Sequence, residues 1–466
     1  MGIKRFIANA DTTITNAYKS NLTIRGTGSN MGASDIMEVF SIYGQESSAS
    51  SELSRILVNF PVSDIQSARA AGSIPASGSV SFYLRLFNAP HGQTLPKDFT
   101  MVVQPLSRSW DEGTGLDMED YSDSDEANWY YSNSSTSWTT PGGDYLATPS
   151  YTASFTLGNE NLSVDISNLV EGWVAGTTGS YGVGIRMTSS IESDTKSYYT
   201  KKFFTRRSEN YLYRPILEAR WDQSKKDSRS NFYASSSVVP AVDNTMTLYL
   251  YNYVHGQLKN IPAAGTGSIY LKMYTSSSGG TDLTATAITG GYVEAGIYSA
   301  SFALDTTASY GYDRWFSSGL TTCFHTGSQI TIRTFNSADF NPEEHWTTKI
   351  TNLKPYYTGS EVARFRVFTK KKAFNQNIYT RSNNNVIPDI VDSAYYSIRR
   401  TDTAEEVIPF GTGSLEYTKL SYDASGSYFD FDMSILEPEQ PYKLQFMYYV
   451  NGKYAVQPEE FKFGVR

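Results

Sequence analysis

Apolar and polar residues alternate with a period of two along much of this chain. The clearest example begins at Val80, where Phe82, Leu84 and Leu86 follow at every second position. Successive side chains of a strand point to opposite faces of a sheet, so this spacing predicts a strand with one buried face. The turn residues from Asn88 to Gly92 end the pattern.

The same alternation returns in the C-terminal half of the chain. It covers residues 246–251, 269–274, 298–304, 330–332, 365–367, 428–431 and 442–450. Glycine pairs and Gly-Thr-Gly turns separate several of these segments. Many short alternating segments between turn signals, together with 35 tyrosines, predict an all-β fold.

One segment has a helical period instead. From Asp165 to Gly176, apolar residues follow the i, i+3, i+4, i+7 spacing, with Trp173 among them. Asp165 or Ser167 can cap the start of the helix, and Gly176 can end it. Trp173 is therefore expected to be a structural residue of the core.

A chain of 466 residues is too long for one core. We expect an N-terminal β-sandwich over residues 1–221 that ends in a strand from Tyr211 to Trp221. Residues 222–230 (DQSKKDSRS) are polar and lack periodicity, which predicts a linker. Residues 231–355 and 356–466 then predict two immunoglobulin-like β-sandwiches.

The last of these regions contains a local motif. Leu436, Pro438 and Tyr442 have the Leu-x-Pro-x-x-x-Tyr spacing of a tyrosine corner, in which a tyrosine fixes the loop between two sheets. This segment resembles the fibronectin type III pattern. Asn451-Gly452 then predicts a two-residue hairpin turn.

Composition excludes several classes of protein. A formal charge of -8 and a pI near 5.2 argue against direct nucleic-acid binding, which needs cations for the phosphates. No apolar run is long enough for a membrane span, and the N-terminus has no apolar core of a secretory signal. We expect the protein to stay in a cytoplasm until it assembles. Cys323 is the only cysteine, so no disulfide framework is expected.

The segment from Ser109 to Ile185 is acidic and rich in tryptophan. It contains Trp110, Trp129, Trp138 and Trp173 but neither Lys nor Arg. Indole rings beside glycine and turn residues need a β framework to hold them.

The order of motifs in this region resembles the DNRLRE-type jelly-roll module. A Trp followed by Glu-Gly, a second Trp, a third Trp leading into Pro-Gly-Gly-Asp, Val-Asp-Ile and a Trp-x-x-Gly follow one another here. Upstream, the segment from Ser54 to Phe60 places Arg55 where that family has its Arg. The resemblance covers roughly residues 10–220 and implies a jelly-roll-like β-sandwich. Such modules occur in carbohydrate-binding regions of secreted bacterial proteins and in structural proteins of tailed phages.

Catalytic motifs are scarce. The four histidines show no metal-binding spacing, and the nucleophile-elbow, phosphate-loop and Cys-x-x-Cys patterns are missing. The run from Asp111 to Glu126 could supply oxygen ligands for Ca²⁺ through Asp120, Asp123 and Asp125. Because the loop glycine and the closing glutamate of a calcium loop are missing, a solvated acidic loop is the alternative. No other cofactor is expected.

The tryptophans allow two interpretations. Trp110, Trp129 and Trp138 could stack on the faces of sugars, or they could be buried at the ends of the sheets. Stacking would make the N-terminal module a glycan-binding site.

The leading functional hypothesis is a non-enzymatic structural protein of a tailed-phage virion, placed in the neck, tail, baseplate, fibre or capsid. KRFIANADTTITNAY, GTGSNMGASDIMEVFSIYG and LYNYVHGQLKNIP resemble segments of structural proteins from tailed phages of marine cyanobacteria and related hosts. This resemblance implies docking to other virion proteins, with the chain forming homo-oligomers in the particle. The alternative is a carbohydrate-binding adhesin or host-recognition protein that binds a host-surface glycan through the N-terminal module.

Overall fold

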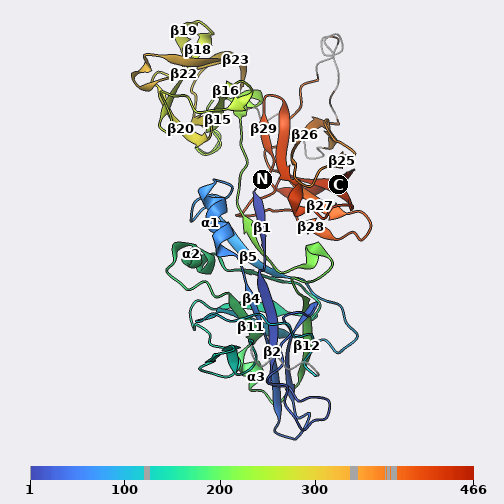
Figure 1. Cartoon of the computed structure of the whole chain (residues 1–466). Helices are drawn as coiled ribbons and strands as arrows, with labels where there is room; N and C mark the ends of the chain where they lie inside the picture. Colours follow the sequence, from blue (N-terminus) through green and yellow to red (C-terminus); the bar gives the residue numbers. More distant parts are fainter. Residues whose placement is uncertain (1, 120–125, 336–344, 373, 375–377, 379–385) are drawn as a thin grey trace. The chain divides into compact units, whose positions relative to one another are not determined.

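Strands make up nearly all of the regular structure, so the predicted all-β fold is confirmed (Figure 1). The computed structural model describes residues 2–119, 126–335, 345–372, 374, 378 and 386–466. The chain divides into two compact units. The N-terminal unit contains Gly2–Trp221 with Ile435–Glu437, and the C-terminal unit contains Asp222–Ser434 with Pro438–Arg466.

The N-terminal unit consists of two sheets packed face to face. The four-stranded sheet has the order β1 (Ile3–Ile7), β13 (Ile216–Arg220), β5 (Ser81–Leu86), β10 (Leu162–Asp165). The larger sheet has the order β12 (Tyr198–Phe204), β3 (Ile36–Tyr43), β4 (Ser51–Asn59), β11 (Val183–Met187), β6 (Phe99–Pro105), β9 (Tyr151–Phe155), and β2 (Ala10–Thr15) pairs with β4. A small hairpin joins β7 (Tyr131–Asn133) and β8 (Thr136–Ser137).

The core of this unit lies between the two sheets. Phe82, Leu84 and Leu86 of β5 are fully buried, in the alternation that the sequence predicted. They share one apolar cluster with Met101 and Val103 of β6. Each fully buried side chain of this size contributes roughly 1.5–3 kcal/mol relative to exposure, so this cluster holds the sheets together.

The predicted helix is α2 (Ser167–Ala175). Gly176 ends it in the left-handed conformation at φ 71°, and Trp173 is buried in the core. The predicted cap by Asp165 or Ser167 is wrong, because Ile166 is the N-cap and no side chain caps the helix. The Asp165 carboxylate still accepts the backbone N–H of Ser167 at 2.9 Å, one residue into the helix.

The sequence did not predict two further helices or the break before β13. Helix α1 (Val62–Ala70) buries only Ile65 and Ala68, which is too few apolar positions to reveal a helical period. Helix α3 (Ser189–Glu192) is a single turn. The expected strand from Tyr211 to Trp221 begins instead as a 3₁₀ turn, η1 (Tyr211–Tyr213), because Pro215 has no N–H for a ladder hydrogen bond.

The C-terminal unit begins with a curled sheet. Its order is β14 (Phe232–Tyr233), β23 (Cys323–Arg333), β22 (Tyr310–Phe316), β18 (Ile269–Ser276), β20 (Ile288–Glu294), β21 (Ile297–Phe302), β15 (Met246–Tyr251), with β19 (Gly279–Asp282) beside β18. β16 (Tyr253–Val254) and β17 (Gln257–Leu258) form a hairpin, and η3 (Ser318–Leu320) is a 3₁₀ turn.

The sheet curls around its core at strand β20, which changes its pairing partner part-way along its length. It pairs with β18 up to Gly290 and with β21 from Gly291 onward. A Cβ on Gly290 would lie 2.4 Å from the Ser299 carbonyl oxygen, so the close approach of the strands requires glycine. The curled sheet encloses an apolar cluster that includes Leu271 and Trp315.

The rest of this unit is a second sandwich. One sheet has the order β24 (Trp346–Ile350), β26 (Val362–Lys371), β30 (Gly426–Asp432), β29 (Ser421–Asp423). The other has the order β25 (Tyr356–Tyr357), β32 (Lys453–Val465), β31 (Pro441–Val450), β27 (Ala394–Arg400), β28 (Glu406–Ile408), and η5 (Met433–Ile435) follows β30. These orders correspond to the ABED and GFC sheets of an immunoglobulin sandwich. β24 belongs to this sandwich although the sequence placed it before the expected boundary at residue 355.

The residues of the predicted tyrosine corner lie in the loop before β31 and at the start of that strand, and the corner itself stays a prediction. Tyr442 stands at the start of β31, the F strand, and is fully buried with its ring centroid 5.9 Å from that of Phe463. Leu436 is buried as well, and Pro438 is half-buried. Asn451 and Gly452 have positive φ values of 53° and 76°, as the predicted hairpin turn requires.

The segment expected to be a linker is an ordered part of the C-terminal unit. Residues 225–227 run beside β29: the Asp227 N–H donates to the Tyr422 carbonyl at 3.0 Å, and the Tyr422 N–H donates to the Lys225 carbonyl at 2.9 Å. The 3₁₀ turn η2 (Ser228–Ser230) follows. The side chains of Asp227, Ser228 and Arg229 are paired, which the sequence pattern did not reveal, whereas Asp222 and Gln223 are exposed as predicted. No helix in the described part of the chain combines the length and the apolar character needed to cross a bilayer.

Candidate functional site

The tryptophans proposed for sugar stacking lie inside the N-terminal unit. Trp110, Trp129 and Trp138 are no more than 9% exposed and share a small apolar cluster. The Trp110 indole N–H donates to the Tyr181 carbonyl, and that of Trp138 donates to the Asn128 carbonyl, both at 2.9 Å. Of the two interpretations, the structure shows core packing, because protein atoms cover the ring faces that a sugar would need.

Arg55 on β4 ties this cluster to the Pro-Gly-Gly-Asp loop. Its Nη1 donates to the Gly142 carbonyl at 2.9 Å, and its Nε and Nη2 bind both oxygens of Glu192 at 3.0 and 2.7 Å. The guanidinium carbon lies 5.1 Å from the Trp129 ring centroid. Gly142 has φ 91°, and a Cβ there would lie 2.7 Å from Nη1 of Arg55. The position of Arg55 therefore leaves no room for a side chain at residue 142, and the two residues have a structural role together.

A polar cavity of about 480 Å³ lies beside Arg55. Its lining includes Asp144, Tyr145, Arg186 and Glu192. Although burial opposes ionisation, the N–H groups of Thr139 and Thr140 hold the pKa of Asp144 below its usual value. Burial raises the pKa of Tyr145, so the phenol stays neutral at physiological pH. The charged side chains of the cavity bind one another, because Glu192 pairs with both Arg55 and Arg186, as in a structural network.

The predicted calcium ligands Asp120, Asp123 and Asp125 lie outside the described residues. Neighbouring carboxylates are paired: Glu112 forms a salt bridge with Arg206, and Glu119 accepts hydrogen bonds from Ser20. Within the described ranges, no group of three or more acidic, His or Cys residues could hold a metal ion. The calcium site remains a prediction.

Asp11 on β2 is a buried carboxylate that the sequence did not single out. Its Oδ2 accepts the Arg206 backbone N–H at 2.6 Å, whereas its Oδ1 is buried without a hydrogen-bond partner in the described structure. Burial, together with the nearby charge of Glu112, raises the pKa of Asp11 to about 7. The sequence gives no signal for this, because Asp11 stands among threonines in an apparently polar segment.

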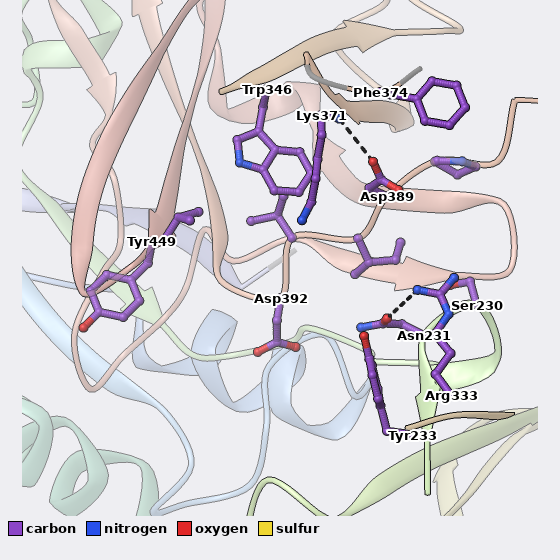
Figure 2. Close-up of a pocket in the computed structure, with 14 residues that line it drawn as sticks. Ser230, Asn231, Tyr233, Arg333, Trp346, Lys371, Phe374, Asp389, Asp392 and Tyr449 are labelled. Carbon is purple, nitrogen blue, oxygen red and sulfur yellow. Dashed lines mark hydrogen bonds between the residues drawn. The ribbon is translucent and has the colours of Figure 1, made fainter. Parts of the chain in front are cut away.

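The C-terminal unit contains the cavity that Figure 2 shows, with a volume of about 560 Å³. Trp346 on β24 and Lys371 at the end of β26 lie on one side of it, and Asp389 and Asp392 come from the segment before β27. The remaining lining residues come from the start of the unit, from the end of β23, from the segments after β26 and before β27, and from β31: Ser230, Asn231, Tyr233, Arg333, Phe374, Pro388, Ile390, Val391, Tyr449 and Val450.

The polar groups of this cavity suit a polar ligand. The backbone N–H of Lys371 donates to the Asp389 carboxylate at 3.1 Å, and Arg333 Nη1 donates to the Asn231 side-chain oxygen at 3.5 Å (Figure 2). Trp346 is 7% exposed, and its indole N–H has no acceptor in the described structure. Sequence reasoning missed this cavity because segments far apart in the chain build it.

A tyrosine patch occupies the outer face of the β31–β32 hairpin. We define it as Tyr395, Met447, Tyr449, Tyr454 and Val456. Tyr449 pairs with Tyr454 across the hairpin with ring centroids 4.7 Å apart. These two tyrosines and Val456 are 44%, 50% and 51% exposed, whereas Tyr395 and Met447 form the buried floor. The sequence predicted the hairpin but not which of its faces would be exposed.

Comparison with known proteins gives no family. No family model and no curated protein matches the chain. The solved structures that are similar over parts of it include an adhesin and a macroglobulin. The adhesin InvE of Yersinia pseudotuberculosis is 14% identical with a TM-score of 0.16, covering 47% of this chain and 54% of InvE. The native conformation of E. coli alpha-2-macroglobulin is 12% identical with a TM-score of 0.16, covering 88% of this chain and 21% of that protein. The chain therefore spans about half of one and a fifth of the other, and scores this low carry no functional information.

Proposed function

We propose that this protein is a non-enzymatic structural protein that docks onto other proteins through the faces of its β-sandwiches. The tyrosine patch carries this proposal. Large exposed apolar patches are rare on monomeric proteins, and they commonly mark sites where another molecule binds. Tyrosine and methionine are also enriched at protein interfaces, where a rigid ring supplies a large contact area at low entropic cost.

The position of the patch supports the same role. It lies at the hairpin end of the GFC sheet, where a partner can approach both tyrosines. At the opposite end of this face, Lys443 and Glu460 form a salt bridge at 2.7 Å. The face thus has an apolar end and a charged end, the arrangement of an interface core beside a polar rim.

The specific assembly we propose is the virion of a tailed phage, which the chain joins after synthesis in the host cytoplasm. The sequence resemblances described above support this step, as does the N-terminal resemblance to DNRLRE-type modules. The partners are other virion proteins and further copies of the chain, without direct contact with nucleic acid or membrane. The chain turns over no substrate in this role.

Co-sedimentation tests the proposal. The full chain should sediment with purified particles in fixed stoichiometry. Tyr449→Ala with Tyr454→Ala should reduce its incorporation at least tenfold, since truncating a tyrosine at the centre of an interface, where hot spots lie, costs about 2 kcal/mol. The matched control is Lys443→Ala on the same face, which should incorporate normally. Normal incorporation of the double tyrosine variant would refute docking through this patch.

The cavity in Figure 2 favours one alternative, a carbohydrate-binding adhesin or host-recognition protein. Its aromatic and charged lining fits a polar, hydroxyl-rich ligand. Glycan-array binding by the full chain that is lost in Arg333→Ala and in Asn231→Ala would establish this alternative. Binding that survives both substitutions would place the glycan elsewhere.

A further inference from the structure

A cavity of about 420 Å³ lies on the outer face of the larger sheet of the N-terminal unit, and we call it the β3–β12 cavity. Met37 and Val39 of β3 belong to the core. The alternate residues Glu38, Phe40 and Ile42 therefore face outward, and they line the cavity. Its size falls within the range of about 300–1,000 Å³ that small-ligand sites have. The rest of the lining comes from β12 and from the loop after β5: Gly92, Gln93, Thr94, Tyr199 and Thr200.

A β-bulge brings two neighbouring residues of β12 to this cavity. The register between β12 and β3 shifts from Tyr198 to Lys201. Tyr199 and Thr200 therefore stand together opposite the single residue Phe40. In a regular strand these neighbours would point to opposite faces, but both line the cavity. Bulges are common next to functional sites, where they redirect a side chain, and this one places an aromatic residue at the cavity.

Backbone pairing with β12 also positions the loop that completes the lining. The Ala89 N–H donates to the Lys202 carbonyl at 3.0 Å, so the loop begins beside β12. Further along the loop, His91 Nδ1 accepts the Gln93 N–H at 3.2 Å, which holds the bend at Gly92. Strand β12 therefore positions two parts of the lining.

The charge in the lining is already paired. Among the described lining residues only Glu38 is charged, and its Oε1 forms a salt bridge with Lys202 at 2.6 Å. Its Oε2 accepts the Thr200 hydroxyl at 3.2 Å. A charged ligand would lose hydration here without gaining a counter-charge, so the cavity favours a neutral ligand.

Three neutral groups of the lining are free to bind such a ligand. The Gln93 amide, the Thr94 hydroxyl and the Tyr199 phenol make no side-chain hydrogen bond within the described ranges of the chain. Gln93 and Thr94 are exposed, and Tyr199 is 50% exposed. The cavity thus combines an aromatic surface with neutral donors and acceptors, which suits a ligand that has both an apolar face and hydroxyl groups.

We infer that the β3–β12 cavity binds one residue of a neutral polysaccharide, with the sugar ring stacked on Tyr199 and its hydroxyls bound by Gln93 and Thr94. A sugar ring offers C–H groups to the face of an aromatic ring, and the hydroxyls at its edge need donors and acceptors. The Gln93 amide can both donate and accept, and so can the Thr94 hydroxyl. An acidic sugar would instead bring its carboxylate near Glu38, whose cation is already paired.

This site goes beyond the docking role proposed above and does not depend on it. Its ligand class is that of the alternative function, but the site lies in the N-terminal unit and the sugar is neutral. The tyrosine patch belongs to the C-terminal unit, so the two roles can be tested separately.

Biolayer interferometry with the full chain tests the inference. The probes are the neutral polymers dextran, mannan and galactan and the acidic polymers alginate and polygalacturonate. The native chain should bind at least one neutral polymer and neither acidic one. Tyr199→Ala should weaken that binding at least about tenfold, because the stacking surface is lost. Tyr199→Phe keeps the ring and should bind within about threefold of the native chain, whereas Gln93→Ala should lose about threefold to tenfold.

Tyr130→Ala is the matched control, because Tyr130 is a 47% exposed tyrosine of the same unit outside the cavity. It should bind like the native chain, as should Arg333→Ala, and circular dichroism should show that every variant is folded. A native chain that binds none of the neutral polymers, or binds only the acidic ones, would overturn the inference. Native-like binding by Tyr199→Ala would overturn it as well. Sedimentation of Tyr199→Ala with particles reports on docking alone, so failure of the glycan site and failure of the docking role are distinguishable.

Discussion

Replacing Asp11 with asparagine should change how the stability of the N-terminal unit depends on pH. Burial raises the pKa of Asp11 to about 7 from an unperturbed 3.8, so the folded protein binds this proton more tightly than the unfolded chain does. The folded state therefore loses stability as pH rises from about 4 to about 7, and the loss is complete above that range.

The structure sets the size of this effect. At about 1.4 kcal/mol per pKa unit, the difference corresponds to about 4 kcal/mol at pH 8. Asp11→Asn removes the charge but keeps an oxygen that can accept the Arg206 N–H, so it should be more stable than the native chain at pH 8. At pH 4 the two proteins should be about equally stable, because the native carboxyl is then protonated.

Urea titrations of the full chain at pH 4 to 8 measure this difference. Hydrogen exchange in peptides from β2 and β4 assigns the unfolding transition to the N-terminal unit. Asp64→Asn, an exposed substitution on α1, is the control and should follow the native pH profile to within about 1 kcal/mol. Parallel profiles for Asp11→Asn and the native chain, or a less stable Asp11→Asn at pH 8, would refute the reasoning.

Two further substitutions test the buried arginines. Gly142→Ala should destabilise the N-terminal unit by about 2–4 kcal/mol, because φ is 91° and the new methyl group meets Arg55; a melting temperature within 1–2 °C of the native value would contradict this. Arg229→Ala should cost about 3–5 kcal/mol, because Arg229 binds both oxygens of the fully buried Asp313 at 2.6 and 2.5 Å. In urea unfolding the exposed Arg364→Ala should cost under about 1 kcal/mol, and equal losses for the two arginines would count against the burial argument.

The sequence predicted the elements in which buried apolar side chains recur with the period of a strand or a helix. Strand β5 and helix α2 have the apolar period of their own geometry, and both were predicted near their observed bounds. The hairpin turn at Asn451 and Gly452 was predicted because its signal is a two-residue pattern. These signals are local, so no knowledge of distant segments was needed.

The errors come from polar residues whose partners lie far away in the chain. Residues 222–230 look like a solvated linker until Tyr422, Thr247 and Asp313 are beside them. Asp11 looks like a surface residue of a threonine-rich strand, yet Arg206 lies 195 positions away and covers it. Charge and polarity along the sequence say which groups need partners, but only the fold says which partners they have.

The central claim is that this chain acts by docking its sandwich faces onto other proteins. Hydrogen exchange of the chain in purified particles, compared with the free chain, tests it most directly. Docking through the tyrosine patch predicts strong protection of residues 447–456 in the particle, with little change around Lys443. Equal exchange at residues 447–456 in the free chain and in the particle, or particles that lack the chain, would contradict it.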